Sequence, residues 1–285
     1  MERLSTAASF AAMKTEVEAE LDRLLAGDSR LYEALRYAVL GGGKRFRPLL
    51  LLSAGEAFGG ERTTLLPFAC AVELIHAYSL VHDDLPCMDN DAFRRGKPSC
   101  HKAFGETGAL LAGDGLLTLA FEVLAEAPAG AAGAGRKDRA VRSIAEAAGV
   151  KGMIAGQWLD VAFDPARADE TSLLELLSLK TGALILASVR AGAIMGGAPA
   201  GVLPEIDRYG RGVGLAFQLR DDLCDAKKKI EGRAGTRPNA AVLFGPEGAK
   251  ARLRGAVDDA LAALDAAGVR SAELRALASG LCLPD

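Results

Sequence analysis

The chain of 285 residues lacks most features of membrane, secreted and nucleic-acid-binding proteins. No uncharged apolar run approaches the roughly 18–20 residues of a membrane span, and the segment MERLSTAASFAAMKTEVEAE has no apolar stretch long enough for a secretory signal. The five cysteines are odd in number and form no C-x-x-C pair, which favours reduced thiols in a cytoplasmic protein. The net charge of −3 argues against a nucleic-acid partner.

Signals for β-strands are also scarce. Aromatic residues make up 5% of the chain, and alternation with a period of two never persists. Apolar residues recur at helical spacing instead, with breaks at stretches such as 41–43 and 196–204. The segments 107–125 and 181–195 are apolar on more than one face, which predicts that they lie inside a bundle. We expect one all-α domain over residues 1–285, with about ten or more helices.

Two acidic segments of the sequence resemble one another. Residues 79–89 read SLVHDDLPCMD, and residues 217–225 read FQLRDDLCD. In the first segment, Pro86 interrupts a helical run directly after two aspartates. In the second segment, four polar side chains fall within about a third of the helical wheel. These four are Gln218, Asp221, Asp222 and Asp225.

The acidic segments predict a site for divalent cations. Like charges at this spacing destabilise a bare helix, and a hard cation, which prefers carboxylate ligands, would offset the repulsion. Magnesium takes one or two carboxylates and completes its shell with water and substrate phosphates, so two facing clusters suit a diphosphate held by bridging Mg²⁺. The spacing does not fit an EF-hand Ca²⁺ loop. A solvated acidic helix face is the alternative for a single cluster, and the repetition disfavours it.

Basic residues accompany the acidic segments. The stretch 41–47 joins a glycine-rich turn to three cations, which suits a phosphate group or an ordinary solvated loop. It lacks the spacing of a P-loop. Three more cations, Arg94, Arg95 and Lys97, follow the first acidic segment. His76 lies seven residues before the first aspartate, two helical turns along the same face, so it either points into the same cleft or is a core histidine.

With these motifs the chain resembles the trans-isoprenyl diphosphate synthases, the polyprenyl synthetase family. The resemblance runs from about Leu31 to Gly245, and GGGKRFRP, ELIHAYSLVHDDLPCMDNDAFRRGKPS, GQWLD, KTGALI and FQLRDDLCD occur in the family's order. It implies a bundle of helices around a deep central cavity, usually in a homodimer. It also implies condensation of isopentenyl diphosphate with an allylic diphosphate, with Mg²⁺ as the cofactor.

The resemblance further implies roles for individual residues. The Mg²⁺ ligands would be Asp83, Asp84, Asp89, Asp221, Asp222 and Asp225. The isopentenyl diphosphate site would hold Lys44, Arg47, His76 and Arg95. The allylic diphosphate would be bound by Arg94, Lys180, Thr181 and Gln218. Of these four, the candidate catalytic residues are Lys180, Gln218 and Arg94, and the role of Arg45 is open.

Product length depends on the size of the cavity. In the family the residue five before the first motif helps to form the cavity floor, and here Tyr78 stands there, followed by Ser79. The helical wheel places Tyr78 about 140° from Asp83, so the floor role depends on the resemblance. The bulky ring and the two extra residues Pro86 and Cys87 resemble the bacterial farnesyl type, with a C15 product. Geranylgeranyl diphosphate synthase, with a C20 product, is the alternative.

The sequence departs from the family after the second acidic segment. The stretch after Asp225 is several residues shorter than usual, and Arg237 stands in place of a lysine. An earlier family lysine would correspond to Lys227, Lys228 or Lys229. An arginine keeps the charge of a lysine but not its shape or hydration, so the diphosphate contact of this stretch is expected to differ.

Two other classes of function compete with an active synthase. A non-catalytic partner subunit would usually have lost an aspartate motif, and both motifs are intact here. A class I terpene cyclase uses similar metal chemistry but normally lacks the GGGKRFRP-like second diphosphate site. Dependence on isopentenyl diphosphate separates the cyclase from the synthase.

Overall fold

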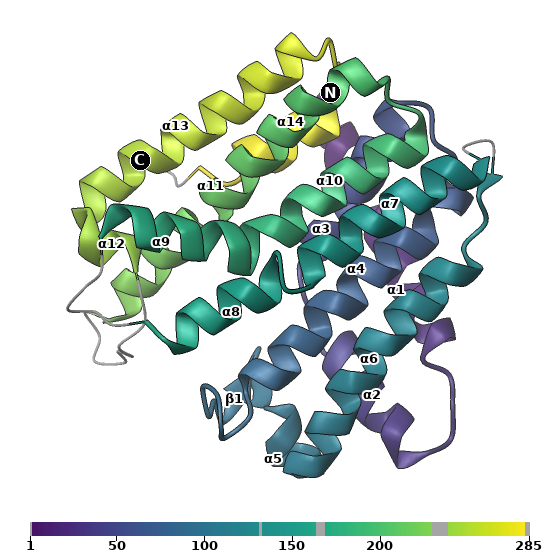
Figure 1. The fold of residues 1–285 in the computed structure, drawn as a ribbon, viewed down its shortest axis with the longest axis vertical. Coiled ribbons are helices and arrows are strands. Elements are labelled where there is room, and N and C mark those ends of the chain that lie inside the picture. The colour runs from purple at the N-terminus through teal and green to yellow at the C-terminus, as the bar shows by residue number, and fades with distance from the viewer. Residues whose placement is uncertain (1, 131–132, 164–168, 230–238, 283–285) are drawn as a thin grey trace.

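Figure 1 shows the computed structural model of the chain, which describes residues 2–130, 133–163, 169–229 and 239–282. For residues 2–5 and 225–229 it describes the backbone only. The predicted contacts of Arg237, of Lys227 to Lys229 and of the Asp225 side chain lie outside the described part.

The described chain is almost entirely helical, so the predicted all-α fold is confirmed. The first helices are α1 (Glu2–Leu24), α2 (Arg30–Leu40), α3 (Phe46–Ala57), α4 (Arg62–Asp83), α5 (Cys100–Phe104) and α6 (Glu106–Glu126). The later helices are α7 (Gly133–Ala148), α8 (Met153–Val161), α9 (Glu170–Leu177), α10 (Ala183–Gly196), α11 (Leu203–Lys229), α12 (Ala240–Leu243), α13 (Gly245–Ala266) and α14 (Ala272–Ser279). The described strands are β1 (Phe93–Arg94) and β2 (Lys97–Pro98), which pair as an antiparallel hairpin.

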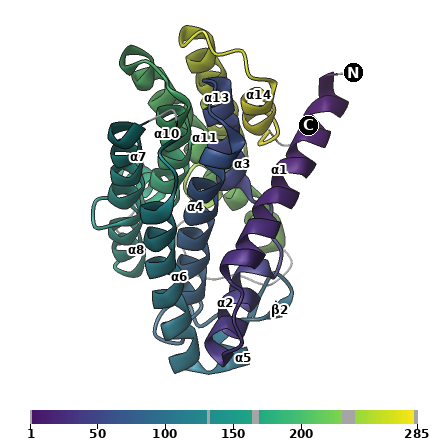
Figure 2. The same ribbon diagram turned by 90° about the vertical axis from the view of Figure 1, so that its right-hand side faces the viewer.

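The core of the bundle forms around α4 and α10. Figure 2 shows α3, α4, α6 and α10 running side by side; α10 packs against α3, α7 and α11, and α4 packs against α3 and α6. Most side chains of α10 are buried, which confirms that the segment 181–195 lies inside the bundle. One continuous apolar cluster reaches from α1 to α14. Assignment of residues 1–285 to one domain stays a prediction.

The outer helix α6 is buried along one face only. Ala112 and Leu116 are fully buried, whereas Leu110 and Leu111 are 47% and 54% exposed. The expectation that the segment 107–125 lies inside the bundle is therefore wrong for one of its faces. The physical reason is that α2, α4 and α5 cover the inner side of α6, and no described element covers the side that carries Leu110 and Leu111.

Within the described part of the chain, three helical stretches are long and apolar enough to cross a membrane by length and composition: α4, α6 and the run 170–196. None of them is an uncharged run, because each contains charged residues, such as Glu73 in α4. In α4, 72% of the most apolar window is buried in the protein, against 39% in α6 and 44% in the third stretch. Burial in the bundle accounts for the apolar character of α4, and the absence of a membrane span stays a prediction.

Candidate active site

Two adjoining hollows lie where α3, α4 and α11 meet. The larger hollow has a volume of about 560 Å³ and is lined by the glycine-rich turn 41–43 and the start of α3. The smaller hollow has a volume of about 330 Å³ and is lined by the end of α4, the π-helical turn Ser178–Gly182 and α11. The two hollows form one site, because four residues line both of them. These four are Arg47, His76, Phe217 and Asp221.

The smaller hollow brings the two acidic segments together. One side of this hollow is lined by Asp83, the last residue of α4, and by Asp89 in the loop after α4. Asp221 of α11 lines it from the other. The predicted opposition of the two segments is therefore present in the structure for these three carboxylates.

The second aspartate of each D-D pair turns away from both hollows. Asp84 is 2% exposed, and Nε of Arg94 donates to its two carboxylate oxygens over 3.1 and 3.2 Å. Asp222 is 5% exposed. It accepts hydrogen bonds from Nε2 of Gln218 at 3.0 Å and from the backbone nitrogen of Ala240 at 2.8 Å. Asp84 and Asp222 thus contact protein groups, and their predicted role as metal ligands stays a prediction.

The larger hollow gathers the cations of the first basic motif. Lys44 is exposed at its rim, and Arg47 and Arg95 line its wall. Gly43 has a φ of +139°, and a Cβ atom there would come within 3.0 Å of the Arg95 guanidinium, so glycine is required for this close approach. Arg95 donates to the carbonyl of Gly42 and closes the turn over the hollow.

The environment of Arg47 is the strongest indication that the larger hollow binds an anion. Its side chain is 7% exposed, and Nε has no hydrogen-bond partner within the described residues. Burial lowers the pKa of Arg47 to about 10, so the guanidinium is still charged at neutral pH. A buried cation with an unused donor is costly unless a ligand supplies the acceptor.

Arg45, whose role the motifs left open, supports the base of the glycine-rich turn 41–43. It is 2% exposed and adopts a left-handed backbone conformation with a φ of +53°. Nη1 lies 2.8 Å from Glu73, Nε lies 3.2 Å from Glu18, and Nη2 lies 2.9 Å from the carbonyl of Val39. The side chain therefore joins α1, α2 and α4 at the base of the glycine-rich turn.

His76 lines both hollows, so of the two predicted alternatives the structure supports a side chain that points into the cleft. Desolvation lowers the pKa of His76 well below its ordinary value of 6.5, and the nearby cations Arg47, Arg95 and Arg94 lower it further. The imidazole is therefore neutral at physiological pH, and it can donate a hydrogen bond without adding charge.

Lys180 and Thr181 reach the smaller hollow from the π-helical turn Ser178–Gly182. Such turns commonly occur at functional sites. Helix α8 crosses directly over this turn at Gly156, where a Cβ atom would lie 2.1 Å from the backbone nitrogen of Lys180. Asp160 of α8 forms an ion pair with the Lys180 ammonium. Gly156 and Asp160 both belong to the GQWLD motif, but no role was predicted for either of them.

Two stacked aromatic rings form part of the lining of the site. The rings of Phe46 and Phe217 stack with their centroids 5.0 Å apart and an interplanar angle of 29°. Both rings line the larger hollow, and Phe217 also lines the smaller one. Phe46 and Phe217 belong to the motifs GGGKRFRP and FQLRDDLCD, but no role was predicted for them, because aromatic residues in helices are usually part of the core.

The candidate chain-length residues lie outside the lining of both hollows. Tyr78 is 6% exposed and packs edge-on against His82, with ring centroids 5.8 Å apart. Burial, with a further contribution from Asp83, raises the pKa of Tyr78 to about 12. Ser79 donates a hydrogen bond to the carbonyl of His76, 2.9 Å away, within α4. A role for Tyr78 and Ser79 in chain length stays a prediction.

The donor set of the smaller hollow fits a magnesium ion that is shared with substrate. Among the described residues no three His, Cys, Asp or Glu side chains are close enough to hold a metal by themselves. Magnesium needs only one or two carboxylates when a phosphate and water complete its octahedron. Asp83, Asp89 and Asp221 are carboxylates of this kind around one hollow.

The carboxylates and cations of this all-helical bundle converge on one site. This arrangement is typical of the class of isoprenoid diphosphate synthases, and comparison with solved structures supports this class. The chain is similar to an FPP/GFPP synthase from Zymomonas mobilis in its apo form, with a TM-score of 0.87, 37% identity and 98% of each chain covered. It is also similar to a geranyltransferase from Legionella pneumophila, with a TM-score of 0.88, 34% identity, and 98% and 96% of the two chains covered.

Sequence comparison shows the family. Residues 28–235 match the model of the family described as polyprenyl synthetase. The farnesyl diphosphate synthase of Geobacillus stearothermophilus is 42% identical over 264 residues, 89% of each chain. A heterodimeric geranylgeranyl pyrophosphate synthase large subunit of Arabidopsis thaliana is 48% identical over 203 residues, 70% of this chain and 55% of that one. The chain belongs to the polyprenyl synthetase family, which confirms the resemblance drawn from the motifs, and it is a prenyltransferase.

Proposed function

We propose that the enzyme condenses isopentenyl diphosphate with dimethylallyl or geranyl diphosphate and releases farnesyl diphosphate. One observation carries the proposal: carboxylates of both acidic segments line a hollow that shares the buried cation Arg47 with a second, basic hollow. Two adjoining sites for diphosphate groups suit a reaction between two diphosphate substrates. The larger hollow is assigned to isopentenyl diphosphate and the smaller to the allylic diphosphate.

The residues of the smaller hollow act on the departing diphosphate. Lys180, Arg94 and Gln218 line this hollow, so their donors can stabilise the negative charge that develops as the allylic carbon–oxygen bond breaks. Bound Mg²⁺ would neutralise part of the same charge, with Asp83, Asp89 and Asp221 as the residues that hold it.

The residues of the larger hollow hold the second substrate in place. Lys44, Arg47 and Arg95 bind its diphosphate, and neutral His76 donates a hydrogen bond beside them. The stacked rings of Phe46 and Phe217 exclude water where the allylic cation forms. The double bond of isopentenyl diphosphate attacks that cation, and the proton then lost passes to the released diphosphate, so no side-chain base is required.

We also propose a homodimer in the cytoplasm. The apolar side chains Leu110 and Leu111 of α6 are exposed, and so are Ile154 and Trp158 of α8, at 45% and 76%. Exposed apolar patches of this kind are typical of protein interfaces. All five cysteines are free thiols in the structure, as expected in a reducing compartment. Sedimentation equilibrium of the purified protein measures the oligomeric state.

A condensation assay tests the proposed function. Purified protein, Mg²⁺, isopentenyl diphosphate and geranyl diphosphate are expected to yield farnesyl diphosphate by chromatography. Activity of the protein alone excludes an obligatory accessory subunit, and turnover of an allylic diphosphate without isopentenyl diphosphate would indicate a terpene cyclase. Absence of condensation, with both substrates bound, would contradict the proposal.

The C15 product is tested at Tyr78. Replacing the ring in Tyr78→Ala removes the bulk that is proposed to stop chain growth, so products longer than C15 are expected. Tyr32→Ala serves as a control, because Tyr32 is a partly buried tyrosine in α2, outside both hollows. An unchanged product profile in Tyr78→Ala would reject the floor role, and a C20 product from the wild type would favour the geranylgeranyl alternative.

A further inference from the structure

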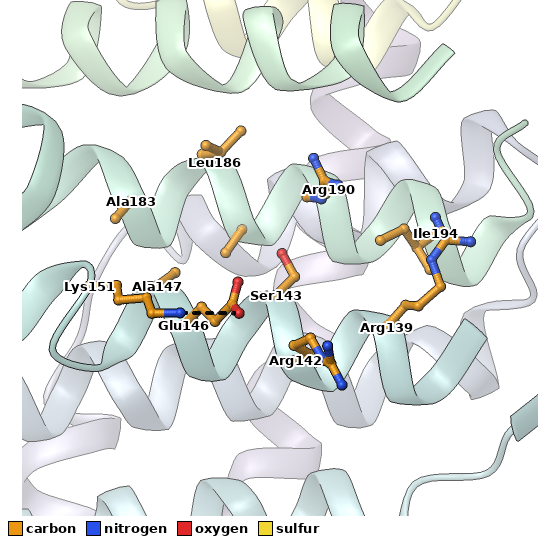
Figure 3. A pocket seen from close by; sticks show the side chains of 11 residues that line it. Arg139, Arg142, Ser143, Glu146, Ala147, Lys151, Ala183, Leu186, Arg190 and Ile194 are labelled. Carbon is orange, nitrogen blue, oxygen red and sulfur yellow. Dashed lines mark ion pairs between the residues drawn. The ribbon is translucent and has the colours of Figure 1, made fainter. Parts of the chain in front are cut away.

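A third cavity lies between α7 and α10 and shares no lining residue with the two hollows of the active site. Its volume is about 570 Å³, within the range of roughly 300–1,000 Å³ typical of small-molecule sites. Figure 3 shows the two helices running side by side, with Ser143 and Arg139 of α7 lying toward α10, and residues of both helices line the cavity. We call this cavity the α7–α10 groove.

The groove combines an apolar floor with a cationic rim. Ala147 of α7 and Ala187 and Ile194 of α10 contribute to the floor, and Ala187 and Ile194 are only 2% and 3% exposed. The rim carries four cations against one carboxylate, Glu146. The four cations are Arg139, Arg142, Lys151 and Arg190. This charge is opposite in sign to the net charge of the whole chain, which is −3.

The carboxylates near the rim pair with Lys151 and Arg190 and leave Arg139 and Arg142 without an ion pair among the described residues. Glu146 lies 3.8 Å from the ammonium of Lys151, as the dashed line in Figure 3 marks. Arg190 forms an ion pair with Asp207 of α11. Within the described part of the chain, Arg139 and Arg142 have no ion pair or side-chain hydrogen bond. Two arginines at the same cavity are therefore available to a ligand.

Two arginines of α7 border the groove close to one another. Arg139 and Arg142 are three residues apart on α7, so they are neighbours on the helix surface and can contact one anion. Guanidinium groups bind phosphate or carboxylate oxygens through paired hydrogen bonds. Figure 3 shows Arg139 extending from α7 toward Ile194, so charge and apolar floor lie beside one another at that end of the groove.

We propose that the α7–α10 groove binds a soluble anionic amphiphile. Arg139 and Arg142 hold its phosphate or diphosphate group, and its apolar chain lies along the alanine-lined floor. The lining of α10 runs from Ala183 to Ile194, a length of about 16 Å at 1.5 Å per residue. A bare inorganic anion would leave this floor exposed to water, so the apolar chain contributes to binding.

Isothermal titration with farnesyl diphosphate in the presence of EDTA tests the proposal. This probe has the required chemistry whatever the product of the enzyme, and EDTA removes the contribution of metal at the active site. The wild type is expected to show a binding event that the double variant Arg139→Ala/Arg142→Ala loses or weakens at least ten-fold. The active-site variant Arg47→Ala is expected to retain it.

A matched control and a fold check accompany the double variant. Arg254→Ala removes an arginine that is exposed on another helix, α13, and is expected to bind the probe as the wild type does. Circular dichroism and Tm establish that each variant is folded. If the double variant binds the probe with the stoichiometry and affinity of the wild type, the groove is not the site and the proposal is overturned.

Two further arms identify the ligand class. Inorganic diphosphate is expected to bind the groove at least ten-fold more weakly than farnesyl diphosphate, and equal affinities would overturn the amphiphile assignment. Sedimentation with phosphatidylglycerol vesicles that depends on Arg139 and Arg142, without binding of the soluble probe, would overturn the soluble ligand in favour of a lipid headgroup. The condensation rate with Mg²⁺ is measured separately and is expected to be unchanged in the double variant. The test of the proposed condensation activity is therefore independent of the test of probe binding at the groove.

Discussion

The two acidic segments carry the same D-D-L triplet and divide its aspartates in the same way. In α4, Asp83 faces the smaller hollow and Asp84 is buried against Arg94 of β1. In α11, Asp221 faces the hollow and Asp222 accepts a hydrogen bond from the first residue of α12. Consecutive residues on a helix point about 100° apart, and here protein groups bind the second carboxylate of each pair on the side away from the hollow. The first aspartate of each pair lines the hollow, and the second anchors the segment that comes next.

The largest effect is expected at the aspartates that face the hollow. Asp83→Asn and Asp221→Asn each remove a charge that holds the cation, so turnover is expected to fall about 10²–10³-fold with an unchanged Tm. Steady-state rates at saturating Mg²⁺ and substrates measure this. Asp258→Asn, at an exposed aspartate of α13, is the control. Turnover near that of the wild type in Asp83→Asn would refute the metal assignment.

The buried partners are expected to affect stability more than chemistry. Asp222→Ala leaves the buried nitrogen of Ala240 without its acceptor, and the free energy of unfolding is expected to fall by about 1–3 kcal/mol. Asp84→Ala removes the acceptor of Arg94 and is expected to act in the same direction. Urea denaturation measures both. An unchanged unfolding midpoint, together with a loss of turnover as large as in Asp83→Asn, would mean that the second aspartates also hold metal.

This division of roles marks the limit of prediction from the sequence. The helical period predicted the helices, because they depend on spacing along one element. The opposition of the acidic segments was inferred from their charge and from the ligands that Mg²⁺ prefers, and the spacing of His76 left two directions open. The wheel placed Asp221 and Asp222 in the same third of the helix, and it could not show that Ala240, from another element, binds one of them. The contacts of Arg45 with Glu18 and Glu73, and the crossing of Gly156 over Lys180, also depend on tertiary packing.

A smaller effect is expected at Arg45. Arg45 and Arg47 differ in the same way as the two aspartates of each pair, because one is bound by protein groups and the other lines the hollow. Arg47 has an unused donor beside the hollow, whereas Arg45 is held by Glu18, Glu73 and Val39. Arg45→Lys keeps the charge but cannot make all three contacts, so KM for isopentenyl diphosphate is expected to rise several-fold while kcat and KM for the allylic diphosphate change little. Equal changes in both KM values would contradict a positioning role for Arg45 at the larger hollow.

The smallest effect is expected from protonation of His76. Desolvation keeps its native pKa well below 6.5, whereas the unfolded chain takes up a proton near pH 6.5. The unfolded state therefore binds more protons in acid, and stability falls as the pH drops below about 6.5. Tm is expected to fall between pH 7.5 and pH 5.5 by more in the wild type than in His76→Gln. An equal fall of Tm in both proteins would mean that a group other than His76 causes the loss of stability in acid.

The ammonium of Lys180 already has a carboxylate partner before any substrate arrives. The π-helical turn and the close crossing of α8 hold it against Asp160, so an incoming ligand has to replace an existing ion pair. A diphosphate, with more negative charge than one carboxylate, can compete for this lysine, whereas an uncharged prenyl alcohol cannot. Breaking the Lys180–Asp160 contact is therefore part of the free-energy cost of binding an allylic diphosphate, and a ligand without charge cannot offset that cost.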